Sequence, residues 1–180
     1  MTIAIGGQAM FNQLITDLRD AAGTADAEAA VKAVLADFVS DPAAAKAALA
    51  DDTEDDVILF EDERISIWFC RFQPGATVPP HNHCMSATIG VFQGVERNDL
   101  YRRDDAAMPE LAESTPIAAG EVVQIAADAV HGVTCISDVP SEAIHVYLGA
   151  LTRTDRSLFD LDAGAELPFT DENYHRLTKM

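Results

Sequence analysis

Two histidines separated by a single residue, His81 and His83, are the side chains in this sequence best placed to bind a metal ion. They follow Pro79-Pro80 in a stretch that we interpret as extended backbone. Side chains alternate between the two faces of a strand, so these two imidazoles should point to the same side. Neutral imidazole is the commonest metal ligand in proteins. The pair predicts part of a metal site, although two surface histidines near a turn would have the same spacing.

A metal site also needs a ligand from elsewhere in the chain. His131 begins a later stretch of strand character, and two strands of one small barrel can bring it beside the first pair. We therefore predict His131 as the third ligand. His145 lies in a further stretch of strand character, whereas His175 sits in a polar tail where we expect it to be exposed.

The composition is that of an ordinary globular chain with a strong acidic excess. Its 180 residues suit one domain with a small appendage, and 48% of them are hydrophobic. Asp and Glu number 30 against 12 Lys and Arg, which gives a formal net charge of −18. A field of this sign repels phosphate backbones and anionic lipid surfaces. Nucleic acid and membranes are therefore not expected as partners.

The cysteines and the amino terminus indicate in which cellular compartment the protein is expected. The sequence has no Cys-x-x-Cys pair and an odd number of cysteines, which is not a disulfide framework; they are Cys70, Cys84 and Cys135. The first residues lack the basic region and long apolar core of a signal peptide. No run approaches the roughly 18 apolar residues of a membrane helix. We expect a soluble, cytoplasmic protein.

Residues 1–56 are expected to form a helical segment that packs on the rest of the chain. Apolar residues recur at three- and four-residue steps in 10–18 and again in 31–39, which is the period of an amphipathic helix. Asp41-Pro42 is typical of an N-cap followed by the first position of a third helix. The segment contains neither histidine nor cysteine. We assign it to packing and not to chemistry.

From residue 57 the pattern changes to short runs rich in β-branched and aromatic residues, separated by turn signals. We predict seven strands, at Val57–Phe60, Ile65–Phe72, Ser86–Phe92, Val95–Arg103, Glu121–Ile125, His131–Ile136 and Ala143–Leu148. So many short strands within residues 57–150 indicate an all-β sandwich or barrel. Residues 151–180 are interpreted as a less regular C-terminal extension, with a last helical turn at Asp171–Thr178.

The spacing of glycines and histidines resembles the two sequence motifs of the cupin superfamily. The matching residues are Gly75, His81, His83 and Gly94 for the first motif and Gly120 and His131 for the second. Cupins are small, jelly-roll-like double-stranded β-helix barrels whose interior holds one metal ion, usually iron, manganese, nickel or zinc. The resemblance covers residues 57–150, and it implies that His81, His83 and His131 are the metal ligands.

One departure from the usual first motif limits the resemblance to one branch of the cupin superfamily. Ala87 and Thr88 stand where cupins usually carry a glutamate ligand, which leaves three histidines and no carboxylate. Such a site resembles the thiol dioxygenases, the cysteine dioxygenase-like branch of the superfamily. That branch carries Ser-x-His-x-Tyr beside its iron, and here Ala143 replaces the serine while His145 and Tyr147 match. The resemblance implies catalytic roles for His145 and Tyr147.

The physical chemistry of the three histidines is compatible with this comparison. Neutral imidazoles leave a divalent ion with its full positive charge and with open coordination positions. Such a centre favours an anionic ligand such as a thiolate, whose pKa the metal lowers. Tyr147 would donate a hydrogen bond toward bound oxygen or substrate, and His145 would orient the phenol. The alternative is that these two residues are an interior pair that satisfies each other's polar atoms.

A thiol that carries a carboxylate would also need a cationic partner, ideally a guanidinium that binds both oxygens. Arg102 and Arg103 are adjacent on a predicted strand, so their side chains face opposite ways and one of them should reach the cavity. We predict this pair as the substrate-binding arginines, while Arg64, Arg71 and Arg97 remain further candidates.

Three functions stay open at this point. The first is an Fe(II) thiol dioxygenase that adds O2 to the sulfur of a small thiol and yields a sulfinic acid. The second is a metal-dependent cupin enzyme of another class, such as a non-thiol oxygenase, a lyase or an isomerase. The third is a non-enzymatic cupin that binds a metal or a small molecule. Zinc, nickel and manganese compete with iron for such a site. A homodimer also stays open, because cupins often pair through sheet edges.

Overall fold

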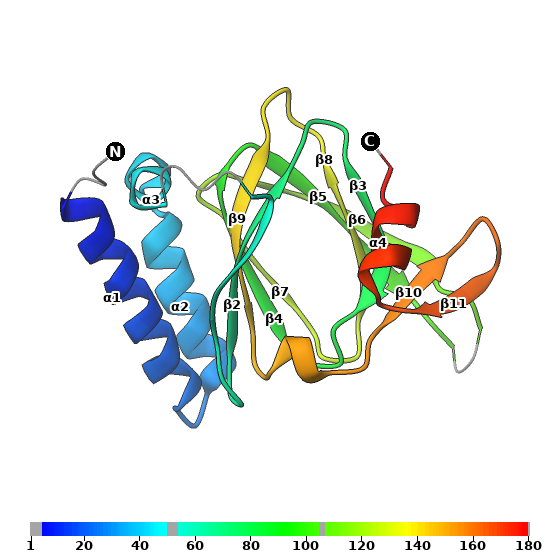
Figure 1. The fold of residues 1–180 in the computed structure, drawn as a ribbon, viewed down its shortest axis with the longest axis horizontal. Coiled ribbons are helices and arrows are strands. Elements are labelled where there is room, and N and C mark those ends of the chain that lie inside the picture. Colours follow the sequence, from blue (N-terminus) through cyan, green and yellow to red (C-terminus); the bar gives the residue numbers. More distant parts are fainter. Residues whose placement is uncertain (1–4, 50–53, 105–106, 180) are drawn as a thin grey trace.

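The computed structural model describes residues 5–49, 54–104 and 107–179. The predicted helical segment 1–56 therefore includes residues 1–4 and 50–53, which lie outside the described part. Two antiparallel sheets face each other, and helices cover the outer side of one of them (Figure 1). The described helices are α1 (Ile5–Ala22), α2 (Ala27–Val39), α3 (Pro42–Ala48) and α4 (Asp171–Leu177). A 3-10 turn at Leu151–Arg153 follows the last strand of the barrel.

The strands divide into a five-stranded and a six-stranded sheet. The first sheet runs, in spatial order, through β1 (Asp56–Glu61), β2 (Ser66–Phe72), β9 (Ser141–Tyr147), β4 (Ala87–Gln93) and β7 (Val122–Ile125). The second runs through β11 (Ala165–Pro168), β10 (Ser157–Asp160), β3 (Thr77–Asn82), β8 (Val130–Cys135), β5 (Val95–Arg102) and β6 (Glu110–Ala118).

The order of the strands defines the fold. Strands β2 to β9 give the neighbours β2-β9-β4-β7 in one sheet and β3-β8-β5-β6 in the other. The chain therefore winds back and forth between two facing sheets as two Greek keys, which is the topology of a jelly roll. The predicted fold class is confirmed: the chain is mainly β, a double-stranded β-helix barrel with an N-terminal helical segment.

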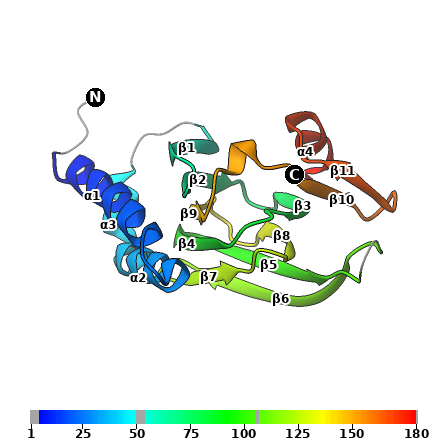
Figure 2. The ribbon, with the colours of Figure 1, turned by 90° about the horizontal axis from the view of Figure 1, so that it is seen from below.

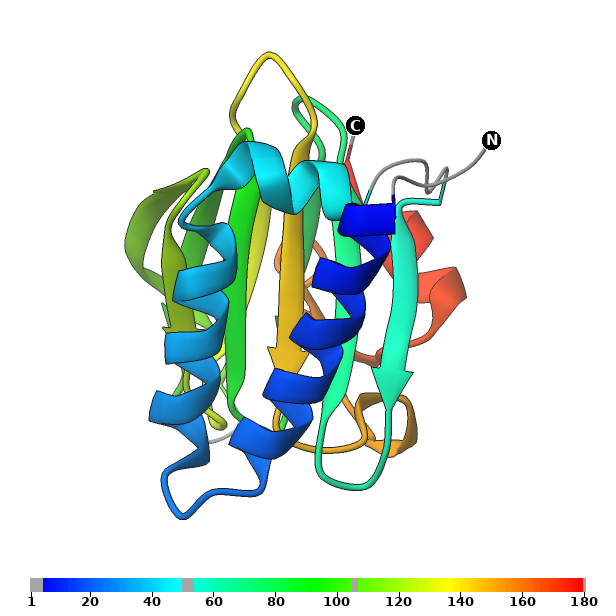
Figure 3. The same cartoon turned by 90° about the vertical axis from the view of Figure 1, so that its left-hand side faces the viewer.

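The N-terminal helices form a separate layer over the first sheet. Figure 3 shows α1 and α2 lying across its outer face. Leu35 and Val39 of α2 are fully buried there, and they contact the sheet at Gly90 of β4. A Cβ at Gly90 would lie 3.1 Å from the Val39 side chain, so the absence of a side chain lets the helix approach closely. The predicted N-cap is also present, because the Asp41 carboxylate accepts a hydrogen bond from the Ala44 amide. None of the helices described is both long and apolar enough to cross a bilayer.

Four strands lie outside the seven predicted runs, namely β3, β6, β10 and β11. Strand β3 agrees with the extended backbone expected around His81, although it is not among the seven runs; it contains Pro79 and Pro80 at a register shift between Val78 and His81. Strand β6 is an edge strand whose first five residues are exposed, so it lacks a continuous apolar face. Both strands nevertheless complete the two Greek keys.

The C-terminal extension is part of the second sheet. Strand β10 pairs with β3 through Leu158 and His81, and β11 pairs with β10. Lys179 closes the extension by exchanging two backbone hydrogen bonds with Thr77 at the start of β3. Figure 2 shows β10, β11 and α4 together at the end of the molecule opposite to α1–α3. The sheet thus continues past residue 150, where the sequence pattern placed the end of the barrel.

The layer formed by α2 leads to a prediction about stability. Replacing Leu35 by alanine should lower the free energy of unfolding by about 2 to 5 kcal/mol, because the side chain is fully buried against β4 and its loss leaves a cavity. Urea denaturation measures the change. Lys32→Ala, on the exposed side of the same helix, is the matched control and should change stability by no more than about 0.5 kcal/mol. A loss below about 1 kcal/mol for Leu35→Ala would contradict the packing of this helix on the sheet.

Candidate metal centre

The three histidines that were predicted as metal ligands meet at one point inside the barrel. His81 of β3 lies directly opposite His131 of β8 in the register of the two strands, and His83 follows just beyond the end of β3. The Nε2 atom of His83 lies 3.1 Å from Nε2 of His81 and 3.3 Å from Nε2 of His131. All three side chains are buried. They form a group of side chains that can hold a metal ion.

The bulge at Pro79-Pro80 explains how β3 presents His81. On a regular strand, Val78 and His81 would face opposite sides, because they are three residues apart. The register shift between them brings both side chains to the same cavity. The register shift at these two prolines therefore determines the direction of the His81 side chain.

The hydrogen bonds of the other ring nitrogens orient the ligand atoms. Nδ1 of His81 lies 3.0 Å from the Pro79 carbonyl oxygen, and Nδ1 of His131 lies 3.1 Å from Oδ1 of Asn98. Both partners are acceptors, so both Nδ1 atoms carry the proton and both Nε2 atoms present a lone pair to the centre. Asn98 lies on β5, two residues before the residue that pairs with His131.

The spacing of the nitrogens fits a bound cation. Two ligand nitrogens at about 2.0–2.1 Å from one ion, with an angle of about 90–109° between them, lie roughly 2.8–3.4 Å apart. The two distances of 3.1 and 3.3 Å fall within this range. A divalent ion would bind the lone pairs of His81 and His131, and His83 would present its own lone pair with its proton on Nδ1. The residues present therefore fit a metal ion.

Burial keeps the three imidazoles in the neutral form that a metal requires. Loss of hydration lowers the pKa of His81 to about 4. The pKa values of His83 and His131 are also well below the usual value, because of burial first and then of the neighbouring imidazoles. No carboxylate belongs to this group among the residues that the structure describes. The group that could hold a metal ion therefore consists of three neutral imidazoles.

A cavity of about 540 Å³ opens beside His81 and His131. Its walls come from both sheets and from the C-terminal extension. Trp68, His145 and Tyr147 form the wall on the first sheet. This volume suits a small molecule. A ligand in the cavity would therefore contact the metal ligands on one side and the first sheet on the other.

His145 and Tyr147 form the predicted pair on this opposite wall. Nδ1 of His145 lies 3.2 Å from the Tyr147 hydroxyl, and the Tyr147 ring packs edge-on against His83 with centroids 4.8 Å apart. Burial lowers the pKa of His145 to about 3 and raises that of Tyr147 well above its usual value. Both groups are therefore neutral. Nε2 of His145 has no hydrogen-bond partner in the described part of the chain, and Ala143 at the position of the usual serine offers none.

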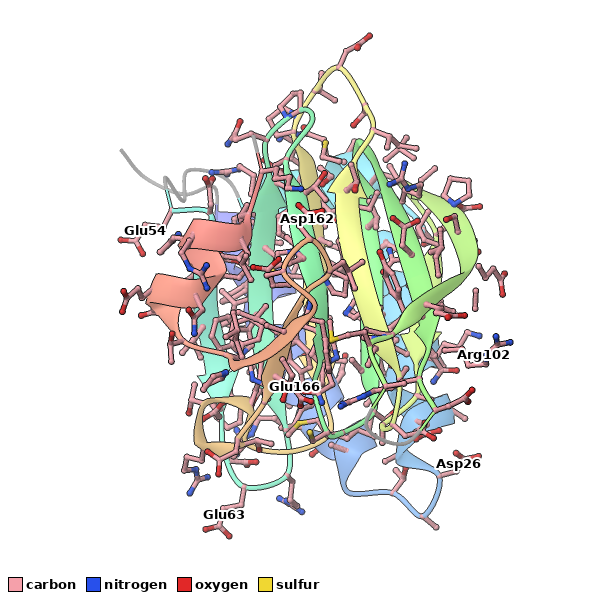
Figure 4. All side chains as sticks on the ribbon, turned by 90° about the vertical axis from the view of Figure 1, so that its right-hand side faces the viewer. Asp26, Glu54, Glu63, Arg102, Asp162 and Glu166 are labelled. Carbon is pink, nitrogen blue, oxygen red and sulfur yellow. The ribbon has the colours of Figure 1, made fainter. Side chains whose placement is uncertain are left out.

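The structure does not bring the predicted arginine pair to this cavity. Arg102 projects outward near the sheet edge, largely exposed and 3.8 Å from Glu110 (Figure 4). Arg103 pairs with Glu166 at 2.5 Å. Strand alternation does send the two side chains apart, but β5 ends at Arg102, so neither reaches the interior. The arginine that lines the cavity is Arg156, which sequence reasoning missed because it belongs to the irregular tail.

Two more residues of the site carried no sequence signal. Asn98 orients His131 from a neighbouring strand, and a lone asparagine in a strand gives no hint of its partner. Phe169 packs against His81 with ring centroids 5.5 Å apart and comes from the C-terminal extension. His175 is exposed, as predicted, and lies at the edge of the same cavity.

The similarity of this chain to known proteins is limited to solved structures. No protein-family model and no curated protein matches the sequence. Among solved structures, a Bacillus halodurans protein is 15% identical over 54% of this chain and 72% of its own, with a TM-score of 0.49. An uncharacterised Klebsiella pneumoniae protein with a double-stranded β-helix domain is 16% identical over 60% and 82%, with a TM-score of 0.46.

A mutant form of the oxalate decarboxylase of Bacillus subtilis is 16% identical over 53% of this chain and 24% of its own, with a TM-score of 0.43. Likeness at these levels concerns the architecture alone. The chemistry of this chain follows from its own residues, which give a double-stranded β-helix with a histidine triad suited to a metal ion.

The role of Asn98 leads to a prediction about metal affinity. Asn98→Ala should weaken zinc binding by about 10- to 100-fold, because His131 loses the acceptor that fixes its ring and tautomer. Competition with a chromophoric chelator measures the affinity. Asn98→Asp keeps an acceptor at this position and should bind zinc nearly as well as the wild type. His175→Ala is the control for a histidine outside the triad, and a loss of affinity equal to that of Asn98→Ala would contradict this assignment.

The burial of His145 leads to a prediction about pH. Its pKa is about 3 in the folded chain against roughly 6.5 in the unfolded chain, so between these values only the unfolded state binds the proton. The free energy of unfolding should therefore fall as the pH is lowered from 6.5 to 4. His145→Gln should remove up to about 1.4 kcal/mol per pH unit from this slope. Urea denaturation of both metal-free proteins tests this, and parallel curves would show that His145 is not held neutral.

Proposed function

We propose that this chain is a metal-dependent oxidoreductase of the thiol dioxygenase type. It would hold Fe(II) on His81, His83 and His131 and add both atoms of O2 to the sulfur of a small thiolate, which gives a sulfinate. The observation that carries this proposal is the placement of three neutral imidazoles and the Tyr147–His145 pair around one small cavity. Zinc, nickel and manganese are alternative occupants of the same three ligands.

The ligand set supports a thiolate substrate. Three neutral nitrogens compensate none of the charge of a divalent ion, so an anionic ligand is favoured at the remaining positions. A bound ferrous ion would supply this positive charge and the redox chemistry that brings dioxygen to the sulfur. Burial of all three imidazoles strengthens the charge interactions at the centre.

The facing wall supplies a proton donor at a fixed place. The raised pKa of Tyr147 keeps its hydroxyl protonated, and the edge-on contact with His83 holds the phenol beside the triad. His145 restrains the hydroxyl through Nδ1, and the Phe72 ring packs against His145 from the side. With its Nδ1 proton donated to the phenol oxygen, His145 leaves the hydroxyl proton free to point at a ligand in the cavity. Tyr147 would thus donate a hydrogen bond to the bound oxygen or to the substrate.

Oxygen uptake by anaerobically iron-loaded protein tests the proposal against a panel of small thiols. Uptake that depends on a thiol, yields its sulfinate and disappears in His131→Ala would support it. Tyr147→Phe should lower kcat roughly 100-fold and leave the iron content unchanged, because it removes only the proton donor. If iron stays bound and no thiol of the panel promotes uptake, thiol oxygenation is excluded for those compounds, and the chain would be a metal-dependent double-stranded β-helix with other chemistry.

A further inference from the structure

Glu96 of β5 is a fully buried acid without a cationic partner. Within the described part of the chain it belongs to no ion pair, and neither of its carboxyl oxygens has a hydrogen-bond partner. Glu142 is also buried, but it pairs with Lys46 and Arg71. Burial of an unpaired carboxylate costs free energy, because the charged form loses its hydration. The position of Glu96 therefore calls for an explanation.

Strand β5 directs Glu96 into the same interior as the histidine triad. Residues that pair directly in an antiparallel ladder share a face of the sheet. His131 pairs with Leu100 and Cys135 pairs with Glu96, and alternation also puts Asn98 on this face. Four residues along a strand span roughly 13 Å, so Glu96 is too far from Leu100 to be a metal ligand. Its charge acts on the centre from a distance, through the interior of the barrel.

The side chains that surround Glu96 are uncharged. Cys135 and Ile117 are its partners on the two neighbouring strands. Ser141 and Cys70 approach it from the facing sheet: the Ser141 hydroxyl lowers the pKa of the Glu96 carboxyl, and the carboxylate raises the pKa of the Cys70 thiol. Thiols, a hydroxyl and an alkyl group cannot neutralise a carboxylate.

The charged and titratable groups nearby supply no positive charge either. Arg97 and Asp99 lie on the opposite face of β5, where they pair with each other at 2.9 Å. Asp56, which approaches the same thiol of β2, is a second acid. The imidazoles of the triad and of His145 are neutral, because burial lowers their pKa values. Among the described residues, no cation therefore offsets Glu96, and burial raises its pKa to about 7.

Asn98 connects Glu96 to the triad. Its Oδ1 accepts the hydrogen bond of His131 Nδ1, whereas its buried Nδ2 has no hydrogen-bond partner in the described part of the chain. An amide donor and a carboxylate acceptor thus lie two residues apart on one face of β5. A negative charge at Glu96 favours the orientation in which Nδ2 turns toward it and Oδ1 turns toward His131. Glu96 is therefore a positioning residue for His131, through Asn98.

We propose that Glu96 is the buried counter-charge of the metal ion and gives up its proton as a divalent cation binds to the triad. Three neutral imidazoles bring no negative charge to the site, so the cation favours the carboxylate form of a nearby acid. The carboxylate favours the cation to the same extent, because such coupling is reciprocal. The carboxyl group loses H⁺ to the solvent, and no electron is transferred. This inference rests on the metal centre of the proposed function and not on its thiol chemistry.

Proton release on zinc binding tests the proposal directly. Calorimetric titration of the full-length protein with zinc near pH 6, in two buffers of different ionisation enthalpy, counts the protons released. The wild type should release roughly 0.5 to 1 proton more than Glu96→Gln, because Glu96 is mostly protonated at this pH until the cation lowers its pKa. Protons from the histidine ligands are common to both proteins, so the difference measures the contribution of Glu96.

The zinc affinity should depend on pH in a matching way. Near pH 8, Glu96→Gln should bind zinc roughly 10-fold more weakly than the wild type, which corresponds to a shift of about one pKa unit. Near pH 5 the two affinities should converge, because the carboxyl group is then protonated in both states. Glu96→Asp keeps a carboxylate and should restore part of this pH dependence. Glu142→Gln removes a buried acid that faces outward and has its own partners, so it should behave as the wild type.

Infrared difference spectra give a measurement on the wild type itself, even if Glu96→Gln does not fold. Zinc should remove the carbonyl band of a protonated carboxyl group, and the band should shift in Glu96→Asp. A band that persists after zinc binds, equal proton release, or parallel affinity profiles would overturn the proposal. If zinc does not bind to the wild type, the metal centre of the proposed function fails as well. If zinc binds with the expected proton release but no thiol promotes oxygen uptake, only the dioxygenase is excluded.

Discussion

The site depends on the close approach of three buried imidazole nitrogens. Nε2 of His83 lies 3.1 Å from that of His81 and 3.3 Å from that of His131, a spacing that a shared proton or a bound cation bridges. The β3–β8 ladder places His81 and His131 face to face, and acceptors at Pro79 and Asn98 hold their rings in that orientation. The fold thus holds the three nitrogens in a preorganised arrangement.

The two sheets of the barrel carry different parts of the site. The sheet of β3 and β8 carries the triad, whereas β9 of the facing sheet carries His145 and Tyr147. The cavity lies between the two sheets, and the packing of the barrel sets the width of this cavity. The helices α1–α3 stay outside this arrangement, because they cover only the outer face of the first sheet. Their contribution is stability, which agrees with a segment that lacks histidine and cysteine.

Sequence reasoning reached the parts of this site that rest on local periodicity. The alternation of a strand is enough to place His81 and His83 on one side, and the apolar stripes of 10–18 and 31–39 are enough for two helices. Sequence reasoning failed for residues whose position depends on tertiary contacts. Arg102 and Arg103 lie on the predicted strand but at its end, and a pattern does not show how far a strand extends into a barrel. Arg156 lies in a tail without periodicity, so only the return of that tail to β3 reveals its place.

Strand β3 has a barrel strand, β8, on one side and a strand of the tail, β10, on the other. The ligand geometry depends on the first neighbour and the composition of the cavity wall on the second. Substitutions in residues 151–180 that keep Leu158 paired with His81 can therefore alter the cavity wall while β8 still holds His131 in place. Variation confined to the tail residues that line the cavity would thus change what the cavity accepts before it changed the three histidines.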